Sequence, residues 1–145
     1  MAAKVAFLLA AAMLLGLVSN SHAIEGTATF YTTYNRFCQY FAKFAAAAAW
    51  TDTASACYGN QDNGKMIAAV SDELWAGDKI CGKMFTVRCV RGTNAVPNPC
   101  HSGTITVKIV DHCPGCNGTL DLSKEAFATI GNPVAGKIVI DYHQA

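Results

Sequence analysis

Short apolar stretches rich in β-branched residues alternate with turn-forming clusters along most of the chain, which is the pattern of an all-β barrel or sandwich. The pattern predicts six strands, at residues 27–31, 66–70, 85–90, 104–111, 119–122 and 137–142. Loops rich in Gly, Pro and Asn separate them. One short helix is predicted after Ser123, a good N-cap residue, and Gly131 with Pro133 ends it.

The segment 37–50 departs from the β pattern. Aromatic residues recur there at helical spacing before a run of alanines, at Phe37, Tyr40, Phe41 and Phe44. This spacing predicts an amphipathic helix. The simpler interpretation is that its aromatic stripe packs against the barrel. The alternative is an exposed face that recruits a partner or a membrane, and the alanine run with its few charges weakens that alternative.

The first 23 residues have the features of a secretory signal peptide. Lys4 precedes an apolar run from Val5 to Val18, and small residues ending at Ala23 form a cleavage site. The run is shorter than the roughly 20 apolar residues of a membrane-spanning helix. We therefore expect a secreted, extracellular chain of residues 24–145 that forms one domain and has no membrane span.

Charge narrows the class of partner. Removal of residues 1–23 removes Lys4 and no acidic residue, so the mature chain carries 10 basic and 10 acidic residues. Nucleic acids and anionic membranes are bound mainly through clustered Lys and Arg, which are absent here. The composition therefore argues against both and favours an uncharged or weakly charged partner.

All seven cysteines lie after the signal peptide, where oxidation to disulfides is expected. Six can pair and one is left over, and composition does not identify the pairs. Cys113-Pro114-Gly115-Cys116, next to His112, raises the alternatives of redox catalysis or zinc binding. A thioredoxin-type motif opens a helix, whereas this one follows a strand, and zinc would require a second ligand pair. We expect no metal and no cofactor.

The strand at 104–111 ends in a carboxylate. Its alternation places Ile105, Val107 and Ile109 on one face, together with Asp111. We expect Asp111 to lie at the barrel mouth, partly desolvated and with a raised pKa, where it could act as an acid or hold a sugar hydroxyl. The alternative is that Asp111 accepts backbone N–H bonds and caps the next loop.

An ordered set of motifs covers residues 26–31 and 56–145. The motifs are Thr27-Ala28-Thr29-Phe30-Tyr31, Ala56-Cys57-Tyr58-Gly59, Cys81-Gly82-Lys83, Val87-Arg88-Cys89, Val110-Asp111-His112-Cys113-Pro114 and Asp121-Leu122-Ser123-Lys124-Glu125-Ala126-Phe127. The chain thereby resembles the plant natriuretic peptide family, which is related to the first domain of expansins, to endoglucanases and to barwin. The resemblance implies an all-β, six-stranded double-psi β-barrel with one or two short helices, braced by disulfides.

The resemblance also implies the cysteine pairing. The expected pairs are Cys57–Cys81, Cys89–Cys100 and Cys113–Cys116, which leaves Cys38 as the odd residue. Cys38 lies in an insertion at about 33–55 that departs from the short link usual in the family. We expect a monomer, with a disulfide dimer through Cys38 as the alternative.

The related endoglucanases hydrolyse cellulose with two carboxylates. Here Asp121 retains the second acid, but Thr32 and Thr33 stand where the first is expected, so the resemblance implies no ordinary cellulase activity and no catalytic residues. Four positions match the polysaccharide groove of expansins: Thr29, Tyr31, Asp111 and Asp121. The alternative role of Thr29 and Tyr31 is packing in the barrel. Lytic cleavage with Asp111 as a lone acid is a further alternative.

In natriuretic peptides the stretch matching residues 57–81 is associated with signalling, and Tyr58 and Trp75 are its candidate surface residues here. The leading hypothesis is a non-enzymatic apoplastic protein that affects water and solute balance through a cell-surface receptor. The alternatives are a domain that binds or weakly cleaves wall polysaccharide, and a barwin-like defence protein. Asn117-Gly118-Thr119 is a glycosylation sequon, but the neighbouring Cys116 constrains it.

Overall fold

The computed structural model describes residues 23–31 and 54–145. Its strands are β1 (Ile24–Tyr31), β2 (Ile67–Val70), β3 (Met84–Gly92), β4 (Ile105–His112), β5 (Leu120–Ser123) and β6 (Ile138–Gln144). Helix α2 (Lys124–Ile130) follows β5, and a short 3₁₀ helix, η2 (Pro133–Ala135), precedes β6. All six predicted strands are therefore present, each within a few residues of its expected bounds. The predicted signal peptide, the segment 37–50 and Cys38 lie outside the described residues.

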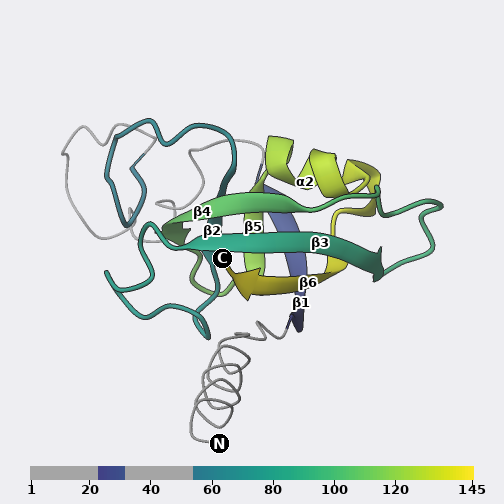
Figure 1. Ribbon diagram of the computed structural model, residues 1–145, viewed down its shortest axis with the longest axis horizontal. Coiled ribbons are helices and arrows are strands. Elements are labelled where there is room, and N and C mark those ends of the chain that lie inside the picture. Colours follow the sequence, from purple (N-terminus) through teal and green to yellow (C-terminus); the bar gives the residue numbers. More distant parts are fainter. Residues whose placement is uncertain (1–22, 32–53) are drawn as a thin grey trace, which may run out of the picture.

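The strands close into a barrel in the order β1-β5-β2-β4-β3-β6, with β6 pairing back to β1 (Figure 1). Two pairs are parallel, β1 with β5 and β2 with β4, and the others are antiparallel. Closure leaves none of these six described strands with an unpaired edge. The all-β, six-stranded architecture expected from the sequence is confirmed.

Alternating apolar residues fill the barrel. Ile105, Val107 and Ile109 of β4 are buried, as the period-2 pattern predicts. Helix α2 adds the fully buried Phe127, whose ring centroid lies 4.7 Å from that of Phe30 on β1. Burial of a Phe side chain contributes about 2–3 kcal/mol, so these contacts hold α2 against the barrel.

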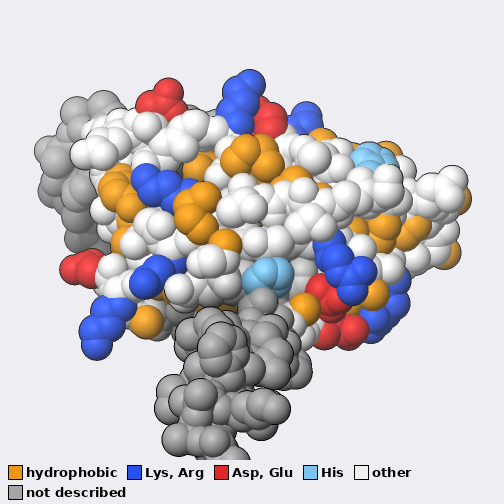
Figure 2. Space-filling view, viewed as in Figure 1, with side chains coloured by type: hydrophobic (Ala, Val, Ile, Leu, Met, Phe, Trp, Pro, Cys, Tyr) orange, Lys and Arg blue, Asp and Glu red, His pale blue; other side chains and the backbone are white. Residues whose placement is uncertain are grey.

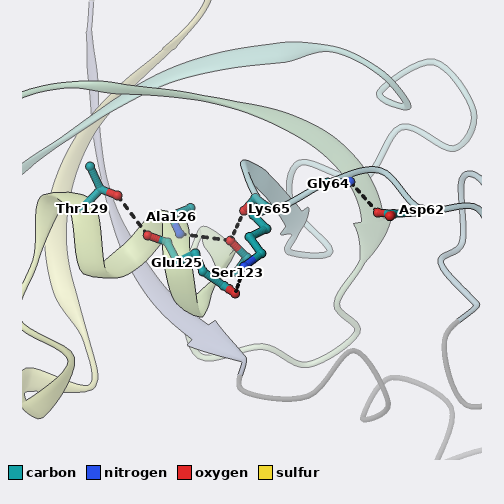
Figure 3. A network of polar contacts seen from close by, with 7 residues as sticks. All are labelled: Asp62, Gly64, Lys65, Ser123, Glu125, Ala126 and Thr129. Atoms are coloured by element: carbon teal, nitrogen blue, oxygen red, sulfur yellow. Dashed lines mark hydrogen bonds and ion pairs between the residues drawn. The ribbon is translucent and has the colours of Figure 1, made fainter.

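Ser123 caps α2 and links it to the loop before β2 (Figure 3). Its Oγ accepts a hydrogen bond from Ala126 N at 3.1 Å and donates one to the carbonyl oxygen of Lys65. The Lys65 ammonium lies 3.5 Å from the Glu125 carboxylate in the first turn. The helix ends at Gly131, as predicted, and its start at Ser123 is fixed by this buried hydroxyl.

Within residues 23–31 and 54–145, three disulfides brace the loops. They join Cys57 to Cys81, Cys89 to Cys100, and Cys113 to Cys116, which are the pairs that the resemblance implied. The first bond closes a long segment, and backbone hydrogen bonds fix both its ends to β4: Cys57 N to Val110 O, and Gly82 N to Ile109 O. Within the described residues, no helix is both long enough and apolar enough to span a bilayer.

Candidate functional site

Four residues form a row across neighbouring strands. Thr29 of β1 registers with Asp121 of β5, Asp121 registers with Ala69 of β2, and Ala69 registers with Asp111 of β4. Ala68 registers with Ile109, and the register shifts between Ala68 and Ala69. This shift removes Asp111 from the face of Ile109, on which strict alternation had placed it. Residues in register on adjacent strands project to the same face of a sheet. The two carboxylates therefore flank the small side chain of Ala69, with their Cα atoms about two strand spacings, or roughly 10 Å, apart. We call these four residues the acid row.

Asp121 is held by Thr29. The Thr29 hydroxyl donates a hydrogen bond of 2.8 Å to Oδ1, while Oδ2 faces Cys113 Sγ at 3.9 Å. The residue is only 8 % exposed, and this burial raises the pKa of Asp121 in spite of the opposing effect of the Thr29 bond. Asp121 is thus a desolvated acid with an oriented carboxyl group.

The carboxyl group of Asp111 accepts hydrogen bonds from two backbone N–H groups. Its Oδ1 accepts hydrogen bonds from Ala56 N at 2.7 Å and His112 N at 2.8 Å, which attach the segment before Cys57 to the end of β4. Burial is the largest influence on its pKa and raises it, while these two bonds oppose the rise. Asp111 therefore combines both expectations from the sequence: it is a desolvated acid, and it is a loop cap.

Tyr31 lies two residues beyond Thr29 on the same face of β1, in register with Ser123. It is half-buried, and it is the last described residue before the insertion. Thr29, Asp121 and Asp111 thus form one row, and Tyr31 extends the same face of the barrel along β1.

Trp75 lies in the turn after β2 and is half-buried against the core. Its ring stacks on that of His112, with centroids 4.5 Å apart and planes inclined by 8°. His112 Nε2 in turn lies 2.8 Å from Asp72 Oδ1, and Asp72 Oδ2 accepts a hydrogen bond from Gly115 N. These contacts connect the turn after β2 to the loop that follows β4.

Tyr58 lies on the surface beside β4. The Lys108 ammonium is 4.0 Å from its ring centroid, in a cation–π contact, and also donates a hydrogen bond to Asn63 Oδ1. Figure 2 shows the face with β3 and β4, where basic, acidic and apolar side chains are interspersed rather than gathered by charge. Tyr58 and Trp75 thus approach β4 from opposite ends of the segment closed by Cys57–Cys81.

Comparison with known proteins identifies the family. The family profile described as "Lytic transglycolase" matches residues 67–142. A putative EG45-like domain containing protein 1 from Arabidopsis thaliana is 50% identical over 90% of this chain and 90% of its own length. An EG45-like domain containing protein from Citrus jambhiri is 44% identical over 92% and 91% respectively. This chain belongs to the EG45-like, plant natriuretic peptide-like family.

Solved structures place this EG45-like chain among double-psi β-barrels. The apo expansin of Clavibacter michiganensis matches with a TM-score of 0.57 and 27% identity over 86% of this chain. A point mutant of that expansin, in complex with cellohexaose, matches with a TM-score of 0.58 and 26% identity. The EG45-like chain spans 50% of the length of each expansin chain.

Cys113, Cys116 and Asp121 bring three potential ligand atoms of this EG45-like domain within 4.8 Å of one another. Zinc binds thiolates, however, and these two sulfurs are bonded to each other. The residues present therefore do not suit a metal while the disulfide is intact.

In the sequon of the EG45-like domain, the side chains of Asn117 and Thr119 both accept hydrogen bonds from other residues. Asn117 Oδ1 accepts a hydrogen bond from Lys137 Nζ at 3.1 Å, and the Thr119 hydroxyl accepts one from Thr27 N at 3.0 Å. Glycosylation of Asn117 stays a prediction, and these contacts oppose it because the transferase needs an extended, accessible segment.

Sequence reasoning did not find the contacts of Asp72 and Lys108. Asp72 follows a strand like many surface acids, and its partners His112 and Gly115 lie about 40 residues further along the chain. No local motif marks such a contact, since it depends on the pairing of β2 with β4.

Proposed function

We propose that this protein is a secreted, non-enzymatic signalling protein of the plant apoplast, which acts through a cell-surface receptor and affects water and solute balance. Membership of the natriuretic peptide-like family supports this, because the match to the EG45-like relatives extends over almost the whole chain. The signal peptide expected at residues 1–23 supports a site of action outside the cell.

The segment between Cys57 and Cys81 carries the proposal. Its ends are joined covalently and bound to neighbouring residues of β4, so its exposed parts before and after β2 are held in fixed positions. Trp75 is half-buried, and one face of its ring stacks on His112. A preorganised aromatic residue of this kind binds a partner protein with little loss of side-chain entropy.

The chemistry of the acid row favours binding over hydrolysis. Inverting hydrolysis of a glycoside requires a protonated acid and an ionised base. Burial raises the pKa of both Asp111 and Asp121, so their environments do not drive the two pKa values apart as an acid–base pair requires. One oxygen of each carboxyl group is also engaged by protein donors.

The test is the volume response of plant protoplasts to the purified secreted protein. We expect swelling at submicromolar concentration, loss of the response in Trp75→Ala, and a full response in Val134→Ala. Val134 is a matched control because it is 77 % exposed and lies on η2, in a different part of the chain. Absence of swelling with the wild-type protein would contradict the signalling proposal.

A second candidate function, binding of a wall polysaccharide, is favoured by the acid row. Carboxyl and hydroxyl groups along one face suit the hydroxyls of a sugar chain. The related bacterial expansin, in its mutant form, is described in complex with cellohexaose. The test is retention on insoluble wall polymers: we expect wild type to be retained and Asp111→Asn to be retained less. Equal retention of both would contradict this candidate.

A further inference from the structure

The disulfide between Cys113 and Cys116 is asymmetric. Cys113 is buried, at 6 % exposed, whereas Cys116 is half-buried and is preceded by the exposed residues Pro114 and Gly115. An external thiol therefore has better access to the sulfur of Cys116 than to that of Cys113. Thiol–disulfide exchange depends on such access and on how well the departing sulfur is stabilised.

Asp121 lies next to the sulfur of Cys113, which is the sulfur released when a thiol attacks Cys116. Its Oδ2 lies 3.9 Å from Cys113 Sγ, and the Thr29 hydroxyl holds the other oxygen at 2.8 Å. In the Cys89–Cys100 disulfide, by contrast, Cys89 Sγ lies 4.0 Å from a neutral group, the carbonyl oxygen of Pro99. Because burial raises the pKa of Asp121, its carboxyl group retains a proton to higher pH than an exposed aspartate does.

The Cys113–Cys116 bond also closes the shortest of the three loops. Its cysteines are 3 residues apart, against 24 for Cys57–Cys81 and 11 for Cys89–Cys100. A short loop restricts the chain least, so opening it removes little of the constraint on the rest of the barrel. The loop is also held without the disulfide, because Asp72 accepts the Gly115 N–H.

We propose that Cys113–Cys116 is a redox-exchangeable disulfide, which an extracellular dithiol reductant opens at Cys116 while Asp121 donates a proton to the departing Cys113 sulfur. The reductant thiolate forms a bond to Cys116 Sγ as the Cys113–Cys116 bond breaks. Its second thiolate then displaces the Cys116 sulfur, which takes a proton from water. Asp121 regains its proton from water. The reductant leaves as a disulfide, and the protein has gained two electrons from it and two protons from water. This site is not of the thioredoxin type, because its Cys-x-x-Cys motif follows a strand and does not open a helix. Here the neighbouring carboxyl group of Asp121 supplies the proton.

The proposal is tested by reducing the full-length secreted protein with dithiothreitol, alkylating at intervals and measuring each cysteine peptide by mass spectrometry. We expect Cys113–Cys116 to open faster than the other two bonds. Asp121→Asn should slow this bond by about a hundredfold, the lower end of the range for general-acid catalysis. The other two bonds report on the fold and should keep their rates. Asp141→Asn is the matched control, since Asp141 pairs with Arg88 on β3 and should leave all three rates unchanged.

The pH profile separates proton donation from a structural role. The ratio of the wild-type rate to the Asp121→Asn rate should be largest in acid and approach 1 as the pH rises through the pKa of Asp121. Asp72 and His112 also border the loop and are present in both proteins, so their effects cancel. If Asp121→Asn fails to fold, Thr29→Val provides a second test. It keeps the Asp121 carboxyl group but removes the hydroxyl that orients it, and it should slow the reduction of Cys113–Cys116. The proposal is overturned if Cys113–Cys116 opens no faster than the other bonds, or if the variant leaves its rate unchanged or alters all three equally.

Discussion

The ring of Trp75 lies parallel to that of His112, 4.5 Å away, although Trp75 lies in the turn after β2 and His112 is the last residue of β4. One face of the indole is thereby covered, and the side chain is held in one orientation. We predict that Trp75→Ala lowers the free energy of unfolding by about 2 kcal/mol, less than the cost of removing a fully buried Trp. Urea denaturation measures this, and Trp75→Phe, which keeps a stacked ring, should lose less than half as much. Equal losses would show that the stacking contributes nothing.

Asp111 is predicted to stabilise the fold through its two backbone hydrogen bonds. Asp111→Ala leaves the N–H groups of Ala56 and His112 without their acceptor, and we expect a loss of about 2–3 kcal/mol in the free energy of unfolding. Asp111→Asn keeps an oxygen acceptor and should lose about 1 kcal/mol. Chemical denaturation of the two variants provides the comparison, and an Asn variant as unstable as the Ala variant would contradict this role.

The pH dependence of stability follows from burial of Asp121. Its pKa is raised in the folded state above the ordinary value of 3.8, so the folded protein holds this proton more tightly than the unfolded chain. The resulting stabilisation is complete below the unfolded pKa and is lost as the pH rises through the folded pKa. The free energy of unfolding of wild type minus that of Asp121→Asn should therefore fall over this range and then level off. Urea titrations at a series of pH values measure it, and a difference that rises with pH would be the wrong sign.

The disulfides should differ in their contribution to stability. By the chain-entropy relation, closures with separations of 24, 11 and 3 residues contribute roughly 3.5, 3 and 2 kcal/mol. Replacing each pair with serines and measuring thermal unfolding tests the order. The Cys113–Cys116 variant should retain the highest melting temperature of the three, and the Cys57–Cys81 variant the lowest. The reverse order would show that local contacts outweigh loop length.

Local pattern predicted the elements of the fold well. The alternation of Ile105, Val107 and Ile109 predicted the buried face of β4, and Ser123 with Gly131 predicted both ends of α2. These signals are contained within a few residues of the chain, where side-chain period and capping chemistry decide the structure. The double-psi β-barrel was implied by family resemblance, and its strand order emerges only from the structure, because pairing between distant strands has no local signature.

The candidate site was only partly predictable. The alternation along β4 indicated a desolvated Asp111, but not that Ala56 N would be one of its donors. The resemblance grouped Asp111 with Asp121, whereas the register that places Ala69 of β2 between them emerges only from the barrel. The contact of Asp121 with Cys113 likewise depends on how the loop after β4 folds back beside β5.

The volume response of protoplasts tests the central claim most directly. The purified secreted protein should cause swelling at submicromolar concentration, and Trp75→Ala, shown by denaturation to remain folded, should cause none. Val134→Ala should behave as wild type. Swelling of the same size with folded Trp75→Ala, or no swelling with the wild-type protein, would contradict a signalling role carried by the segment between Cys57 and Cys81.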